Sequence, residues 1–159
     1  MTDEAGLLPD DLRVWMRVLA AAGAVEQLIT KKVKQEFGVT HDEFLVLCLL
    51  ADQPDFTLRM SRIAELLGRP KTRLTYQVGC LHHSNLVTRE SVRGDRRGIA
   101  LTLTEKGKRL LAEKGPLLAG AVRDALGATI GPDQSAALTG LLARACPEAA
   151  QAAQAEDLH

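Results

Sequence analysis

Residues 60–103 read MSRIAELLGRPKTRLTYQVGCLHHSNLVTRESVRGDRRGIALTL. Residues 60–67 place their apolar side chains on one helical face and stop at Gly68, a residue that favours the left-handed end of a helix. Residues 70–84 then repeat apolar residues at the spacing i, i+4 and i+7, which is again the spacing of a helix. The stretch therefore predicts two short helices joined by a tight turn.

The hydrophobic period shortens to about two after Asn85, a residue that tolerates the left-handed conformation and can end a helix. Residues 86–92 and 99–103 are expected to form paired strands. Between them lies the turn sequence Arg93-Gly94-Asp95-Arg96-Arg97-Gly98. Two short helices followed by such a hairpin make a winged helix-turn-helix, in which the hairpin is the wing.

The second of these helices shows polar side chains opposite its apolar face, and all of them can donate hydrogen bonds. We expect base and phosphate contacts from Lys71, Thr72, Arg73, Thr75, Tyr76 and Gln77. A helix fits the major groove, where polar side chains read base edges. A thin hairpin reaches the minor groove, whose negative potential attracts arginine. The wing offers Arg93, Arg96 and Arg97. The order of elements favours double-stranded DNA as partner over a solvated helix and a charged loop in an ordinary helical domain.

Two signals mark the boundary in front of this unit. Gly38 supplies the stop of a long helical pattern, and Thr40 with Glu43 three residues later forms a capping box. The helix that begins there is apolar almost all round, so it is expected to be central and buried.

Helices are also expected on both sides of the unit. Residues 9–37 keep helical apolar spacing, and a further helix starting at Glu105 is expected to be kinked or ended by Pro116. A last helix follows the break at residues 131–133. We expect residues 1–159 to form a single domain, mainly α with a small β-hairpin wing.

The charges are distributed unevenly along a chain whose formal net charge is zero. Residues 59–109 hold twelve Lys and Arg against four Asp and Glu, so they carry +8 and the remainder carries −8. A basic middle between acidic ends fits a phosphate-binding face mounted on a non-binding scaffold, although a charge run is often only a solvated face. Hydrophobic residues make up 46% of the chain and aromatic residues 3%, so the core is aliphatic, which suits packed helices.

No apolar run approaches the roughly 18 residues that a membrane span needs. The acidic residues Asp3 and Glu4 do not fit a signal peptide, so a cytoplasmic location is expected. Cys48, Cys80 and Cys146 lack CxxC spacing and lie among apolar neighbours, which predicts buried, reduced thiols.

Nothing in the sequence calls for a metal, a cofactor or an enzyme. His82 and His83 are adjacent, so on a helix they point about 100° apart and do not readily share one ion. His41 and His159 are not at ligand spacing either. The chain has no Gly-rich phosphate loop, no nucleophile elbow and no HExxH motif.

A set of short motifs follows in order between Val39 and Leu111. They are Phe44-Leu45-Val46-Leu47, Ile63-Ala64-Glu65-Leu66-Leu67-Gly68, Leu81 to Asn85-Leu86-Val87, Arg89, Asp95-Arg96-Arg97-Gly98 and Leu101-Thr102-Leu103-Thr104-Glu105-Lys106-Gly107. Either the Asp-x-Arg wing or the Leu-Thr-x-x-Gly helix start is weak alone, but their combination is specific. In these residues, over about half of its length, the chain resembles the MarR-type transcriptional regulators.

The resemblance implies roles for individual residues within a DNA-binding lobe at 39–111. Residues 70–84 would be the recognition helix. Asp95 would hold the wing by pairing with an arginine, while Arg96 or Arg97 enters the minor groove.

Three positions depart from the family pattern. Pro70 stands where the family often has a serine cap, and Tyr76 stands where it often has arginine. Asn85 replaces the usual glycine. The backbone permits the asparagine, whereas the changes at Pro70 and Tyr76 lead us to expect a base preference different from that of better-known members.

The resemblance also implies a homodimer in which residues 9–37 and 116–146 intertwine with those of a second subunit. Two recognition helices would then read a pseudo-palindromic site with half-sites about one helical turn apart. The family commonly binds small anionic or phenolic ligands between the dimerisation helices and the DNA-binding lobe. Candidates for lining that crevice are Arg13, Trp15, Arg17 and His41. The alternative is that Trp15 belongs to the core and both arginines are solvated.

Two branches of the family fit less well. Peroxide sensors use a cysteine near the start of the first long helix, and none precedes Cys48 here. A urate-sensing branch has an acidic residue in the second helix near the position of Leu45, which this chain lacks.

We therefore expect a sequence-specific, dimeric transcriptional regulator, most often a repressor, that a small ligand releases from DNA. The alternatives are an architectural DNA-binding protein without an effector and a winged-helix module that binds protein. The basic middle and the arginine-tipped wing count against the module, and an enzyme is the weakest alternative.

Overall fold

The computed structural model describes residues 7–127 and Gly140. Within them it has five helices and a three-stranded sheet, in the order α1, α2, β1, α3, α4, β2, β3, α5. The break at residues 131–133, most of the last helix expected after it, Cys146 and His159 lie outside the described residues. The part of the expected dimerisation segment 116–146 that follows Gly127 does so too, apart from Gly140.

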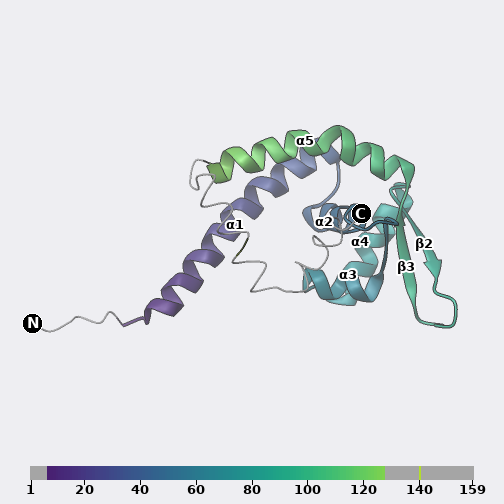
Figure 1. The fold of residues 1–159 in the computed structure, drawn as a ribbon, viewed down its shortest axis with the longest axis horizontal. Coiled ribbons are helices and arrows are strands. Elements are labelled where there is room, and N and C mark those ends of the chain that lie inside the picture. Colours follow the sequence, from purple (N-terminus) through teal and green to yellow (C-terminus); the bar gives the residue numbers. More distant parts are fainter. Residues whose placement is uncertain (1–6, 128–139, 141–159) are drawn as a thin grey trace, which may run out of the picture.

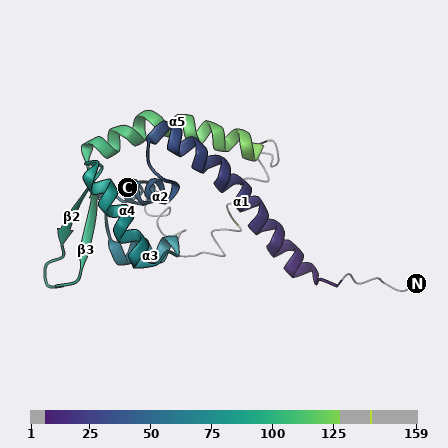
Figure 2. The same ribbon diagram turned by 180° about the vertical axis from the view of Figure 1, so that it is seen from behind.

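Helix α1 (Asp10–Phe37) has two unlike halves. Asp10 and Asp11 occupy its positive end, and Gly38 stops it with φ of 69°, as expected. Its C-terminal residues Val33 and Phe37 are buried, whereas Trp15 in its first turns is 60% exposed. Figures 1 and 2 show the N-terminal half projecting away from the remaining elements.

Helix α2 (His41–Ala51) forms the centre of the lobe. The Thr40 hydroxyl accepts from the Glu43 N–H at 3.2 Å and the Glu43 carboxylate accepts from the Thr40 N–H at 2.9 Å, so the predicted capping box is present. Val46, Leu47 and Leu50 have no exposed surface. Helices α3 (Met60–Leu67) and α4 (Lys71–His83) pack beside α2, which makes the predicted helix-turn-helix part of the same core.

The wing sheet has one strand more than the sequence predicted. Strands β2 (Val87–Ser91) and β3 (Ile99–Leu103) pair antiparallel as expected, and Asn85 precedes them with φ of 57°. Strand β1 (Thr57–Arg59) adds to the other side of β3, giving the order β1-β3-β2. A strand of three residues is too short to show an alternating pattern, which is why the sequence did not reveal it.

Helix α5 (Glu105–Gly127) follows β3 through Thr104, whose hydroxyl accepts from the Gly107 N–H at 3.1 Å. A Cβ on Gly107 would lie 2.6 Å from the carbonyl oxygen of Leu86, so only glycine lets the helix start pack this closely. The expectation that Pro116 kinks or ends the helix is corrected in part, because α5 continues through it at the expense of one backbone hydrogen bond. Figures 1 and 2 show α5 bowed over the lobe and lying beside the C-terminal half of α1.

No helix in the described part of the chain combines the length and the apolar character that crossing a membrane would require.

Candidate nucleic-acid interface

Helix α4 presents a buried face to the lobe and a polar face to solvent. Leu74, Val78 and Leu81 point into the core, with at most 1% of their surface exposed. The exposed side chains on the opposite face and its edges include Lys71, Thr72, Thr75 and Tyr76. Five of the six residues expected to contact DNA from this helix are exposed, these four and Arg73.

The start of α4 suits an anionic partner. Pro70 is the N-cap and makes no side-chain capping bond, and the first turn contains no acidic residue. The first N–H groups of a helix carry partial positive charge and bind phosphate readily. A serine cap, as the related regulators often have, would occupy one of these N–H groups.

The wing turn is built by short backbone contacts. The Val92 N–H donates to the Gly98 carbonyl at 2.9 Å and the Gly98 N–H donates to the Asp95 carbonyl at 3.1 Å, while Gly94 takes φ of 83°. This arrangement leaves the turn's arginines exposed, and they are Arg93, Arg96 and Arg97. The turn is therefore ordered in its backbone and cationic on its surface.

Asp95 connects this turn to the sheet. One carboxylate oxygen accepts from the Arg97 N–H at 3.1 Å, and the other lies 3.7 Å from the Arg59 guanidinium on β1. A Cβ on Gly98 would come within 2.6 Å of the same carboxylate. Asp95 thus pairs with Arg59, a residue that the sequence reasoning did not single out because β1 itself was not recognised.

A hollow of about 310 Å³ separates the wing from α4. Lys71 and Thr75 line it from α4, Arg97 lines it from the wing, and Arg59 and Ser61 line it from β1 and α3. Side chains from sequence segments roughly 25 residues apart therefore share one concave surface. Arg59 and Ser61 extend the predicted interface, and only the fold identifies them.

Two residues expected to contact DNA lie elsewhere. Gln77 is only 7% exposed, and its amide donates to the Oδ2 atom of Asp42 at 3.0 Å, so it does not face solvent here. Arg73 is 59% exposed, but its guanidinium lies 2.7 Å from the same carboxylate oxygen. Both side chains turn toward α2 because Asp42 offers a buried negative charge there.

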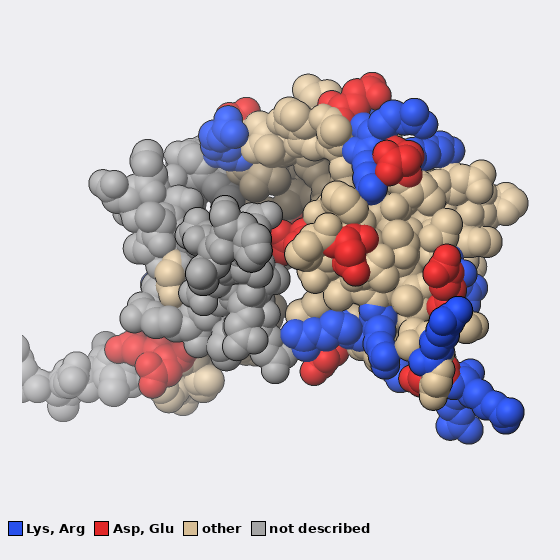
Figure 3. All heavy atoms as spheres, turned by 45° about the vertical axis from the view of Figure 1, so that its right-hand side comes forward, with Lys and Arg blue, Asp and Glu red and all other residues tan. Residues whose placement is uncertain are grey.

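Basic residues line the lower edge of the face drawn in Figure 3. Figure 3 shows Lys and Arg along the lower surface and at the wing tip, with fewer acidic residues between them. The upper surface carries both signs. The lower group of basic residues therefore lies where α3, α4 and the wing turn lie.

Comparisons with known proteins agree with this geometry. The sequence model of the MarR family matches residues 37–98, from the end of α1 to the end of the wing turn. The fold resembles Sco3205, a MarR family transcriptional regulator from Streptomyces coelicolor in complex with DNA, with 27% identity and a TM-score of 0.76. That similarity covers 91% of each chain. Residues 37–98 are thus MarR-type in sequence, and the fold resembles that of MarR family regulators over 91% of the chain.

Two further MarR-type structures extend the comparison. AbsC, also a regulator from Streptomyces coelicolor, is 27% identical with a TM-score of 0.72, covering 95% of this chain and 99% of that one. BpsR of Bordetella bronchiseptica, whose DNA binding is regulated by 6-hydroxynicotinic acid, is 20% identical with a TM-score of 0.70, covering 83% of this chain and 97% of that one. A search of curated proteins found no match. These similarities identify the chain as a MarR-type DNA-binding transcriptional regulator.

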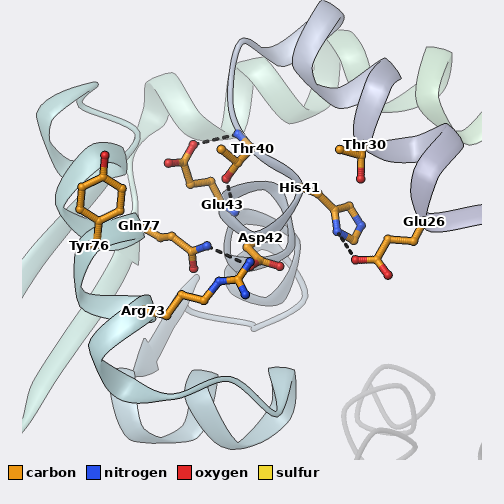
Figure 4. Close-up of a pocket in the computed structure, with 9 residues that line it drawn as sticks. All are labelled: Glu26, Thr30, Thr40, His41, Asp42, Glu43, Arg73, Tyr76 and Gln77. Carbon is orange, nitrogen blue, oxygen red and sulfur yellow. Dashed lines mark hydrogen bonds and ion pairs between the residues drawn. The ribbon is translucent and has the colours of Figure 1, made fainter. Parts of the chain in front are cut away.

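This MarR-type chain also has a crevice of about 470 Å³ between α1, α2 and α4 (Figure 4). Glu26 and Thr30 line it from α1, His41 and Asp42 from α2, and Tyr76 from α4, together with Thr40, Glu43, Arg73 and Gln77. The Nδ1 atom of His41 is 3.5 Å from Glu26, and this buried nitrogen makes no hydrogen bond. The buried Oε1 atom of Gln77 has no donor either. The crevice therefore offers polar atoms with unused hydrogen-bonding capacity.

The structure does not bring together the four residues expected to line a ligand crevice. His41 lines this one, whereas Arg13, Trp15 and Arg17 are exposed on the first turns of α1. Arg13 bonds locally to the Leu8 carbonyl at 3.0 Å. A helix rises about 1.5 Å per residue, so these residues lie roughly 14–20 Å along α1 from Glu26. Trp15 does not belong to the core of the chain either.

The thiol of Cys48 is not activated. Burial, and secondly the nearby carboxylate of Asp52, raise the pKa of Cys48 to about 11. Cys48 and Cys80 are both half-buried and unpaired with another cysteine. Among the described residues no three His, Cys, Asp or Glu side chains are grouped as metal ligands would be.

Proposed function

We propose that the chain works as a homodimer that binds a pseudo-palindromic site in double-stranded DNA and represses transcription until a small molecule releases it. The observation that carries the proposal is the shared surface of α4 and the wing, where Lys71, Thr75 and Arg97 line one hollow. α4 would enter the major groove with Thr72 and Tyr76 outermost. The wing would place Arg97, flanked by Arg93 and Arg96, at the minor groove.

The exposed half of α1 supports the dimer. Its side chains Leu12, Trp15, Met16 and Leu19 recur at helical spacing and are 48–60% exposed. Val14 and Val18 are also more than half exposed. A helix that is apolar on most sides needs a partner surface, and a second copy of α1 and α5 would provide one. Residues 9–37 and 116–146 are then the dimerisation helices, and 39–111 is the DNA-binding lobe.

Selection of genomic DNA fragments by the purified protein, titrated against salt, tests the DNA part of the proposal. Recovery of an inverted repeat, bound by two chains per site and with affinity falling steeply as salt rises, would support it. Binding without any shared sequence would favour an architectural protein. The absence of binding at low salt would favour a module that contacts protein.

The crevice at His41 supports regulation by a ligand, because it contacts the long helix α1 and the recognition helix α4 together. A molecule bound there would favour one relative position of these helices, and so one spacing of the two recognition helices in a dimer. The class of ligand expected is small and anionic or phenolic. 6-Hydroxynicotinic acid, which regulates BpsR, is a suitable first probe.

The ligand test measures operator affinity with and without this probe, in the native chain and in a variant carrying His41→Ala. A probe that weakens operator binding by the native chain and leaves the variant unaffected would support a regulatory crevice. If a panel of such acids leaves operator affinity unchanged, the effector part of the proposal is wrong and the DNA-binding part stands.

A further inference from the structure

Asp42, in the first turn of α2, lies between α2 and the recognition helix. Its side chain is 6% exposed, yet it has three side-chain partners. The Oδ2 atom is 2.7 Å from Arg73 and 3.0 Å from the Gln77 amide, and the Oδ1 atom is 3.4 Å from Arg69. Figure 4 shows Arg73 and Gln77 extending from α4 toward this carboxylate.

The carboxylate is charged in this environment. Burial on its own would raise the pKa of Asp42, but the hydrogen bond from Gln77 and the charges of Arg69 and Arg73 outweigh it and hold the pKa below its ordinary value. A buried carboxylate with two cations beside it is a strong electrostatic anchor. Removal of one partner would therefore change the position or the effective charge of the others.

The position of Arg73 gives this anchor a consequence for DNA binding. It is the third residue of α4, on the flank that faces α1 and α2, and its side chain as a whole is 59% exposed. An exposed arginine so near the start of a recognition helix would ordinarily bind a phosphate. Here its charge is compensated by Asp42, and its side chain is directed into the crevice rather than outward.

We propose that Asp42 is a positioning residue for DNA recognition, which holds Arg73 beside α2 and prevents it from binding phosphate without regard to sequence. Interactions with phosphate raise affinity for every sequence, whereas interactions with base edges discriminate between sequences. Withholding one arginine per subunit lowers binding to random DNA and so raises the ratio of specific to non-specific affinity. This inference rests on the proposed role of α4 as the recognition helix.

Asp42→Asn is the direct test, because asparagine keeps the shape and an acceptor for Gln77 while removing the charge. The released Arg73 should steepen the slope of log affinity against log salt for a random duplex by about 0.9 for each phosphate that it neutralises. That corresponds to an affinity ratio of roughly three- to fourfold per phosphate between 50 and 200 mM salt. The affinity ratio of operator to random duplex should fall.

Arg73→Ala and the double variant carrying both changes complete the cycle. Arg73→Ala alone should leave random-duplex affinity and its salt slope unchanged, and it should cancel the effect of Asp42→Asn in the double variant. Glu113→Gln is the matched control, since it removes one exposed carboxylate on α5, far along the chain from Arg73. It should not reproduce the change in slope.

Several results would overturn the inference. One is an Asp42→Asn variant with the random-duplex affinity and slope of the native chain. Another is an Arg73→Ala variant for which the slope of log affinity against log salt on a random duplex becomes shallower by about 0.9 per subunit. That result would mean that Arg73 already binds phosphate in the native chain. The Arg73→Ala result stands even if Asp42→Asn fails to fold, because Arg73 is exposed. If the native chain binds no duplex at all, the proposed function is wrong, and this inference, which depends on it, is wrong as well.

Discussion

The Oδ2 atom of Asp95 lies 3.7 Å from the Nη1 atom of Arg59, so an ion pair joins the wing turn to strand β1. Both side chains are about half exposed, and pairs of this kind contribute little to the free energy of unfolding. Their effect is geometric. The same carboxylate accepts from the Arg97 N–H, so it fixes the backbone of the arginine expected in the minor groove relative to the sheet.

Replacing Asp95 by alanine should therefore reduce operator affinity more than random-duplex affinity. A displaced wing no longer fits the minor groove of the operator, whereas the loss of one negative charge favours binding to any duplex. The unfolding free energy should change by less than about 1 kcal/mol. Fluorescence anisotropy on both duplexes and urea denaturation measure these quantities. Glu90→Ala removes an exposed carboxylate from β2 without touching the turn and is the control. Equal effects of the two variants would contradict a positioning role for Asp95.

Arg97→Ala should weaken binding to operator DNA and lower the salt slope by about 0.9 for each phosphate that is no longer neutralised. The reason is that Arg97 lines the hollow between wing and α4 and is exposed toward the partner. Titrations at several salt concentrations give the slope. Arg123→Ala, an exposed cation on α5, should leave it unchanged. If affinity and slope are both unaffected by Arg97→Ala, the wing is not in the interface.

Gly107→Ala should destabilise the fold by about 1–3 kcal/mol, because the new methyl group would meet the Leu86 carbonyl and the Leu103 side chain at 2.6 Å. Gly120→Ala is the matched change in the same helix, where nothing in the described chain lies within 4 Å of the added atom. It should raise the unfolding free energy by up to about 1 kcal/mol through helix propensity. Urea denaturation of both variants checks the difference, and equal stabilities would show that α5 does not start as closely against β2 as described.

The pH dependence of stability should show the Asp42 anchor. Its pKa in the folded chain is below the ordinary value of 3.8, so its stabilising contribution is present at neutral pH and is lost as pH falls below that value. The difference in unfolding free energy between the native chain and Asp42→Asn should be largest above about pH 5 and shrink toward about pH 3. A difference that stays constant over this range would mean that the charge of Asp42 does not stabilise the fold.

Much of the fold could be predicted because local chemistry agrees with it. Gly38, Gly68 and Asn85 adopt the left-handed conformation that their residue types favour, and the Thr40–Glu43 capping box marks the start of α2. These signals depend on neighbouring residues only, so one sequence is enough to read them. The change of hydrophobic period placed β2 and β3 for the same reason.

The sequence did not reveal side-chain positions that depend on residues distant along the chain. Gln77 has a polar side chain on a helix flank, and only the buried carboxylate of Asp42, 35 positions earlier, draws it inside. Arg59 became visible as a partner of Asp95 only once β1 was seen to pair with β3. Pro116 was expected to kink or end the helix that starts at Glu105, yet α5 continues through it to Gly127 and lies against α1.

The strand order β1-β3-β2 also has a consequence for the kinetics of folding. The β2–β3 hairpin closes a short loop, whereas Thr57 must find Thr102 across 45 positions, where their hydroxyls meet at 2.8 Å. Closing a long loop costs more entropy and is slower, so β1 should dock after α3 and α4 have formed between the two strands. A newly synthesised chain would then acquire its hairpin early and anchor it late, and substitutions in β1 should mainly accelerate unfolding.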